Sequence, residues 1–160
     1  MFTKDGILAL HGWTHARLDI VVEHAATLTA DEFARELPGF GYPSIREQLM
    51  HTLGAEERWV LRLQDMPTRQ WSAADFPTAA PLRAVKERVM RATEAYLDRL
   101  PDAALNVPLA QRPKQWIGEL RSPAFILHHV LTHAFHHKGQ VVAMCRLLGH
   151  PAPDTDLQQG

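Results

Sequence analysis

The chain has 160 residues, of which 46% are hydrophobic, and a formal net charge of −1 from 17 basic and 18 acidic side chains. This length suffices for one domain with a substantial core, so we expect a single domain over residues 1–160. The balanced charge argues against a nucleic-acid partner and against binding to an anionic membrane surface.

The sequence carries no sign of export or of membrane insertion. Residues 1–6 lack the apolar segment of a signal peptide, and no stretch approaches the roughly 20 apolar residues of a membrane span. The single cysteine, Cys145, excludes an internal disulfide and suits a reducing compartment. We therefore expect a cytoplasmic protein in which Cys145 is a small core residue, with a nucleophilic role as the lesser alternative.

Two long helices are predicted in the first half of the chain. Over residues 4–28, apolar and histidine side chains recur every three or four positions, which is the period of one helix face. A short helical piece is expected at residues 29–37, followed by a segment rich in proline and glycine that breaks the chain. Ser44 as N-cap, with Glu47 three residues later, predicts a capping box and a second helix over residues 44–65.

The second half contains two further helices and two long connections. Residues 67–81 are expected to form a connection, and residues 81–100 the third helix. Residues 101–121 read as irregular, with a candidate short strand near residues 115–117. The fourth helix, residues 122–149, opens with a serine cap followed by proline and closes at a glycine.

Four amphipathic helices and scarce strand signals specify an all-α fold. We predict a four-helix bundle with long crossover connections. Bundles build metal sites in their cores from side chains on facing helices, so this fold class suits the histidine pattern described next.

Histidines are concentrated in the fourth helix, where five of the ten in the chain fall within residues 127–140. At about 100° of rotation per residue, His129, His133 and His137 follow one another down one face, which is also apolar. Buried imidazoles need partners, because an unpaired buried polar group costs about 1–3 kcal/mol. Histidines four residues apart on a helix bind a divalent metal in known sites, while hydrogen-bonded core histidines are the alternative.

One ion cannot use all three of these histidines, because His129 and His137 are about 12 Å apart along the helix axis. A third ligand must then come from another helix. His51, in the middle of the second predicted helix, has the small residues Gly54 and Ala55 beside it, which leave room for an ion and a ligand. The most apolar face of that helix lies opposite, so His51 either lines a pocket or is solvated.

His11 and His15 form a rival pair, four residues apart on the apolar face of the first predicted helix. They could form a second metal site, complete the first one or line its pocket. Histidines at the edge of the core that are satisfied by hydrogen bonds are the favoured interpretation.

Two motifs frame these histidines. The second predicted helix has Leu-Met-His-Thr-Leu-Gly-Ala-Glu around His51, and the fourth has His-x3-His-x3-His-Lys-Gly-Gln from His129 to Gln140, followed by Gly149 and a short proline and aspartate tail. Together they resemble the DinB family, within the DinB/YfiT-like metalloenzyme superfamily. The resemblance spans nearly the whole chain and extends to a tryptophan in the first helix.

The resemblance implies that His51, His133 and His137 bind one divalent metal, zinc or nickel, with water at an open position. His129 is then expected one turn outside the site. Family members usually have Asn where Thr132 stands, and commonly an Asn near His15. We expect these departures to affect the polarity of the pocket rather than the ligands. The resemblance also implies a homodimer.

Three neutral imidazoles leave a metal its full charge, so a bound water can become hydroxide near neutral pH, or a thiol can bind directly as thiolate. Relatives in the superfamily include thiol-dependent transferases and isomerases. The resemblance therefore favours a thiol (S-)transferase-like enzyme with a small-molecule substrate and a low-molecular-weight thiol as co-substrate. A metal-dependent hydrolase and a non-catalytic metal-binding stress-response protein are the alternatives.

The catalytic residues beyond the metal ligands are not identified by the sequence. Glu56, Glu57 and Asp156 are the carboxylates considered as a general base, and no pattern favours any of them. Arg58 shares the helix face of His51 and could hold the carboxylate of a thiol through a bidentate contact, with a solvated surface arginine as the alternative.

Overall fold

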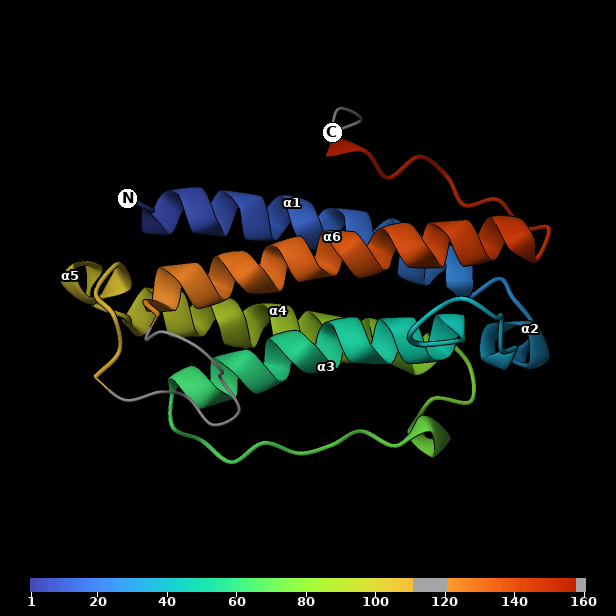
Figure 1. Ribbon diagram of the computed structural model, residues 1–160, viewed down its shortest axis with the longest axis horizontal. Coiled ribbons are helices and arrows are strands. Elements are labelled where there is room, and N and C mark those ends of the chain that lie inside the picture. The colour runs from blue at the N-terminus through green and yellow to red at the C-terminus, as the bar shows by residue number, and fades with distance from the viewer. Residues whose placement is uncertain (111–120, 158–160) are drawn as a thin grey trace.

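Four long helices form the computed structural model, which describes residues 1–110 and 121–157. They are α1 (Lys4–Ala25), α3 (Ile45–Leu63), α4 (Ala80–Arg99) and α6 (Pro123–Leu147) (Figure 1). The hydroxyls of Thr3, Ser44 and Ser122 cap α1, α3 and α6 by accepting a backbone N–H three residues on. The predicted all-α four-helix bundle is confirmed.

Three one-turn elements complete the described chain: α2 (Ala30–Ala34), the 3-10 turn η1 (Ala73–Asp75) and α5 (Asp102–Leu105). A capping box opens α2, but the helix ends before the predicted residue 37. The sequence did not predict η1 and α5, because a single turn is too short to show a helical period. The candidate strand near residues 115–117 lies outside the described residues.

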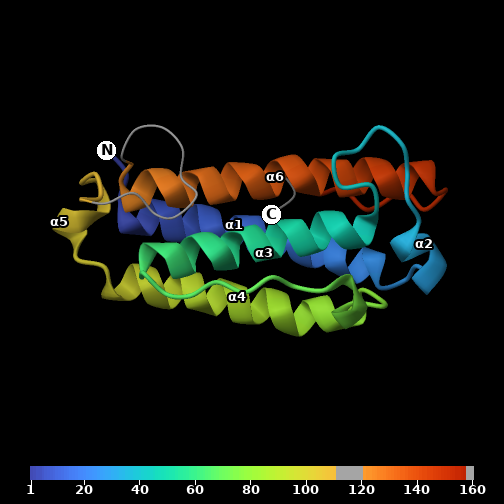
Figure 2. The same ribbon diagram turned by 60° about the horizontal axis from the view of Figure 1, so that its bottom comes forward.

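The helices are arranged so that α3 packs against α4 and α6, and α1 packs against the same two helices. Figures 1 and 2 show that α1 and α6 run in one direction and that α3 and α4 run in the other. The connection from α3 to α4 must therefore return along the length of the bundle, and it does so as the predicted crossover. None of the described helices has both the length and the apolar composition that a membrane span requires.

Two clusters of buried apolar side chains form the core. The larger includes Leu18 of α1, Leu49 of α3 and Met144 of α6, and the smaller includes Ile7 of α1 and Leu97 of α4. Burial of each such side chain stabilises the fold by roughly 1.5–3 kcal/mol. The core therefore has two apolar parts at different levels of the bundle.

Cys145 lies fully within the larger cluster, as predicted for a core residue. Burial raises the pKa of its thiol to about 11. A thiol in this environment stays protonated at neutral pH, so the alternative reading of Cys145 as a nucleophile has no support.

A polar layer separates the two apolar clusters along the helices. Glu56, on α3 between the clusters, is 3% exposed and accepts hydrogen bonds from His11 Nε2 at 2.8 Å, His15 Nε2 at 3.0 Å and Thr93 Oγ1 at 2.6 Å. Burial alone would raise the pKa of Glu56, but the hydrogen bonds from the two histidines and their charges outweigh it and hold the pKa well below its ordinary value. The favoured reading of His11 and His15 as hydrogen-bonded core histidines agrees with these contacts.

Replacing Glu56 with Ala is expected to lower the free energy of unfolding by about 3–5 kcal/mol, because three buried donors lose their acceptor and the core gains a cavity. Urea denaturation at pH 7 measures this. Glu87→Ala is the matched control, because the Glu87 carboxylate is exposed and pairs with Arg91 at the surface, where solvent screens the interaction. Equal destabilisation by the two substitutions would contradict the assigned role of the polar layer.

The stability contribution of Glu56 should also depend on pH. Its pKa is lower in the folded state than the ordinary 4.5, so the contribution is present above pH 4.5 and is lost as the pH falls toward the folded-state pKa. The difference in unfolding free energy between the wild type and Glu56→Gln should therefore shrink as the pH falls below about 4.5. A difference that grows below pH 4.5 would contradict this sign.

Candidate metal centre

Three histidine side chains from two facing helices converge where α3 packs against α6. His51 comes from α3, and His133 and His137 come from α6, one turn apart. One ring nitrogen from each lies within 4.8 Å of the others. The structure thus brings together the three residues that the resemblance implied as ligands, and their binding of a metal stays a prediction.

The closest contact in this group joins His51 Nε2 and His133 Nε2, which are 2.9 Å apart. Two nitrogen lone pairs repel at this distance unless a proton or a cation lies between them. Burial, followed by the proximity of His137, lowers the pKa of His51 to about 4 and that of His133 to about 3. Both rings are therefore neutral at pH 7, and three neutral imidazoles are a suitable donor set for zinc or nickel.

The orientation of the His137 ring is fixed by a chain of amide hydrogen bonds. Its Nδ1 lies 2.6 Å from Gln48 Oε1, so Nδ1–H donates and Nε2 keeps a lone pair. The Gln48 amide nitrogen in turn donates to Gln140 Oε1 at 2.6 Å and to the Tyr42 carbonyl at 2.8 Å. Sequence analysis missed Gln48, although its place one turn before His51 and the Gln140 of the last motif were available signals.

His129 lies outside the group, as expected. Its ring centroid is 5.8 Å from that of His133, and its ring meets Trp59 edge-on at 6.2 Å. Burial lowers the pKa of His129, so this ring is neutral as well.

The polar layer of His11, His15 and Glu56 also has the spacing of a possible metal site. Histidines that bind a metal ordinarily donate their second ring nitrogen to an acceptor. The Nδ1 atoms of His11 and His15 are buried, and neither has a hydrogen-bond partner among the described residues. This layer therefore fits a metal less well than the group around His51, and it neither completes that group nor lines its pocket.

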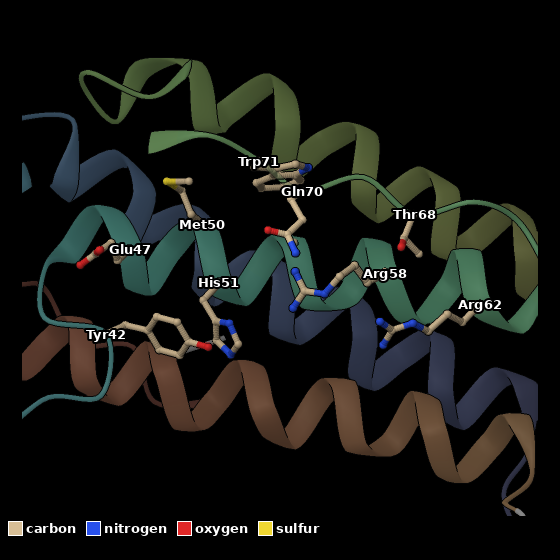
Figure 3. A pocket seen from close by; sticks show the side chains of 10 residues that line it. Tyr42, Glu47, Met50, His51, Arg58, Arg62, Thr68, Gln70 and Trp71 are labelled. Carbon is tan, nitrogen blue, oxygen red and sulfur yellow. The ribbon is translucent and has the colours of Figure 1, made fainter. Parts of the chain in front are cut away.

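A pocket of about 440 Å³ opens beside His51 (Figure 3). Helix α3 forms one wall of the pocket, and the connection between α3 and α4 forms the other. The Tyr42 ring, from the loop before α3, stacks on His51 with centroids 3.9 Å apart and an interplanar angle of 21°. The residues that line the pocket are Tyr42, Glu47, Met50, His51, Gly54, Arg58, Arg62, Thr68, Gln70 and Trp71.

The pocket shows which of the two alternatives for His51, a place in a pocket wall or full solvation, is correct. Leu49 and Leu53 are buried in the core, while His51 on the other side is half-buried at the pocket. The helix is therefore buried on two sides and its polar side lines the pocket, as the first reading proposed.

Two expectations about the pocket were wrong. Thr132 is exposed, with its hydroxyl donating to carbonyls of its own helix, and neither Thr132 nor any residue of α1 around His15 lines the pocket, so neither departure from the family pattern affects it. Thr132 and His15 lie on helix faces that do not carry the three-histidine group.

None of the three carboxylates considered as a general base lines the pocket. Glu56 belongs to the polar layer, Glu57 accepts hydrogen bonds from the Trp71 indole and Arg88, and Asp156 is exposed in the tail. Glu47, which the sequence suggested only as a capping residue, lines the pocket instead. Its carboxylate accepts from the Ser44 hydroxyl at 3.0 Å, so the predicted capping box is only partly formed.

Comparisons with known proteins agree with the geometry. The model of the DinB family matches residues 1–159. The uncharacterized protein YizA of Bacillus subtilis (strain 168) is 25% identical over 126 residues, which cover 76% of this chain and 74% of that protein.

A graded series of substitutions should separate the ligands from their neighbours. His137→Ala is expected to abolish tight metal binding, and Gln48→Ala to weaken it by about 10–100-fold, because Gln48 only orients a ligand. His128→Ala, on the same helix but with its ring against Phe2, should bind one metal per chain like the wild type. Metal titration by calorimetry measures the series, and circular dichroism checks the helix content. Unchanged affinity in His137→Ala would contradict the ligand assignment.

Proposed function

This chain belongs to the DinB family, and on that premise we propose that it is a metal-dependent enzyme that transfers a low-molecular-weight thiol to an electrophilic small molecule. The observation that carries the proposal is the group of three neutral imidazoles from His51, His133 and His137, of which His51 also lines a pocket. The family supplies the context of metal-binding enzymes, and the pocket supplies the room for a substrate.

The chain's own residues would prepare the centre for a metal in two ways. The low pKa values of His51 and His133 keep both rings unprotonated at neutral pH. Gln48 holds the proton of His137 on Nδ1 and so leaves Nε2 as a donor. Zinc or nickel bound there would lower the pKa of a thiol or water that coordinates it, which makes a thiolate available at pH 7.

The donor set also leaves room for a substrate. Among the described residues the group has three members, whereas zinc prefers at least four ligands. A site with three protein ligands keeps a position for an exchangeable group, as catalytic zinc sites do. The pocket that His51 lines would bring a small molecule next to such a centre, which favours an enzyme over a non-catalytic metal-binding protein.

Thiol transfer makes few further demands on the side chains of the pocket. The sulfur attacks an electrophilic carbon, a carbon–sulfur bond forms, and the electron pair of the broken bond leaves with the departing group. The thiol proton passes to solvent when the thiol is bound. The chain must therefore bind and orient two small molecules, and the mixture of polar and apolar side chains around the pocket suits that task.

Metal-dependent hydrolysis is the second candidate, and the position of Glu47 favours it. Glu47 is the only carboxylate among the described residues that lines the pocket, so it is the available general base for a water. Its hydrogen bond from the Ser44 hydroxyl ties it to the start of α3.

Transfer activity is expected to require both the metal and the thiol. Metal-loaded protein should convert an activated aryl chloride and a thiol to the thioether and chloride, with the rate above background lost in chelator-treated protein and in His137→Ala. Absorbance of the thioether product measures the rate, and titrations in buffers of different ionisation enthalpy should report about one proton released per thiol bound.

A set of activated esters provides the comparison for hydrolysis. If the metal-loaded protein forms no thioether with any thiol but hydrolyses esters, and Glu47→Gln removes that hydrolysis, the transferase proposal is wrong and the hydrolase takes its place.

A further inference from the structure

Arg58 folds back along α3 toward the histidine centre, and its guanidinium points into the pocket (Figure 3). A Cβ atom added at Gly54 would lie 3.2 Å from Arg58 Nη1, so the guanidinium occupies the space left by a glycine one turn earlier. Gly54 follows His51 by three residues, or about 4.5 Å along the helix axis. The cation therefore lies over the turn of α3 next to the centre.

No hydrogen bond or ion pair joins the Arg58 guanidinium to a carboxylate in the described parts of the chain, and Glu57 acts on it only as a nearby charge. Glu57, the adjacent acidic residue, is engaged instead by the Trp71 indole at 2.8 Å and by Arg88. The Arg58 side chain is half-buried, and this loss of hydration lowers the pKa of its guanidinium. A half-buried cation of this kind is stabilised by an anion that enters the pocket.

Arg62 lines the same pocket but differs from Arg58 in position and in contacts. It is one turn farther from His51, and its guanidinium carbon lies 4.7 Å from the centroid of the Trp59 ring. Arg62 is therefore held by a cation–π contact at the far end of the pocket. Arg58 is the better-placed cation for a molecule that also reaches the centre.

The opposite wall of the pocket near Arg58 is formed by Trp71 and Gln70. The indole nitrogen of Trp71 donates a hydrogen bond to Glu57, which fixes the Trp71 ring beside Gly54. The Cε3 atom of this ring would lie 3.7 Å from a Cβ added at Gly54. Gln70 points into the same space in Figure 3. A short chain of methylene groups would fit between this wall and α3, with a charged end at Arg58.

We infer that the pocket selects thiols that carry a carboxylate close to the sulfur, with the carboxylate bound by Arg58 and the sulfur at the histidine centre. The planar guanidinium fork matches a carboxylate bidentately. The closeness of Arg58 to His51 restricts the class to short mercapto-carboxylic acids, including cysteine derivatives with a free carboxylate. This inference rests on the proposed function, because it requires thiol binding at the centre.

Matched thiols test the inference by binding rather than by turnover. Protein loaded with cobalt(II) is titrated with 3-mercaptopropionate and with 2-mercaptoethanol, which lacks the carboxylate, and the thiolate-to-cobalt absorption band reports binding. In the wild type we expect the mercapto acid to bind about 10–100-fold more tightly, as a charge-assisted contact would give. Arg58→Gln should lose this preference, Arg58→Lys should keep part of it, and Arg62→Gln should keep nearly all of it.

The outcomes separate this inference from the proposal on which it rests. If neither thiol gives the absorption band in cobalt-loaded wild type, thiol binding fails and both proposals are overturned. If both thiols give the band with equal affinity, or if Arg62→Gln removes the preference as fully as Arg58→Gln, only the role of Arg58 is overturned. The cobalt d–d spectrum and the circular dichroism of each variant show that the centre and the fold are intact.

Discussion

The hydrogen bonds of Gln48 across the interface between α3 and α6 fix the register on which the candidate centre depends. The Gln48 side chain is fully buried, and its amide accepts from His137 and donates to Gln140. A shift of the α3 sequence by one residue would rotate the Gln48 side chain by about 100° around the helix axis. The buried amide group of Gln48 would then lose its hydrogen-bond partners. The same register places His51 opposite His133, so the polar contacts that align the helices also assemble the site.

The two polar groups of the bundle interior use different faces of α3 and therefore act independently. His51 and Glu56 are five residues apart, which is about 140° around the helix. Glu56 faces α1 and α4, where His11, His15 and Thr93 surround it. The negative charge of Glu56 is thus satisfied locally, and within residues 1–110 and 121–157 no acidic side chain belongs to the three-histidine group. A metal at that group would keep the full double charge that makes it effective at lowering the pKa of a bound thiol.

The sequence predicted much of the fold, because its signals were local. Cap residues such as Ser44 and Ser122 lie at the observed helix starts, and the spacing of His133 and His137 placed both on one helix face. Spacing alone did not decide whether His129 belonged to the site. The resemblance to the DinB family made that choice, because it specified the third histidine on another helix.

The pocket was much harder to predict, since its walls come from segments without periodicity. Trp71 lies beside α3 because its indole donates to Glu57, and Tyr42 stacks on His51 from an irregular loop. Both contacts join residues whose proximity depends on the tertiary path of a connection. For the same reason Glu56 was considered as a general base: the pattern of α3 alone does not tell which neighbouring helix each polar face will meet.

X-ray absorption at the zinc K-edge of zinc-loaded protein, before and after addition of a thiol, tests the central claim most directly. The account predicts three imidazole nitrogens at about 2.0–2.1 Å together with an oxygen that a sulfur at about 2.3 Å replaces when thiol is added. A closed shell of four protein ligands that does not change with thiol, or a zinc without the three imidazoles, would contradict it.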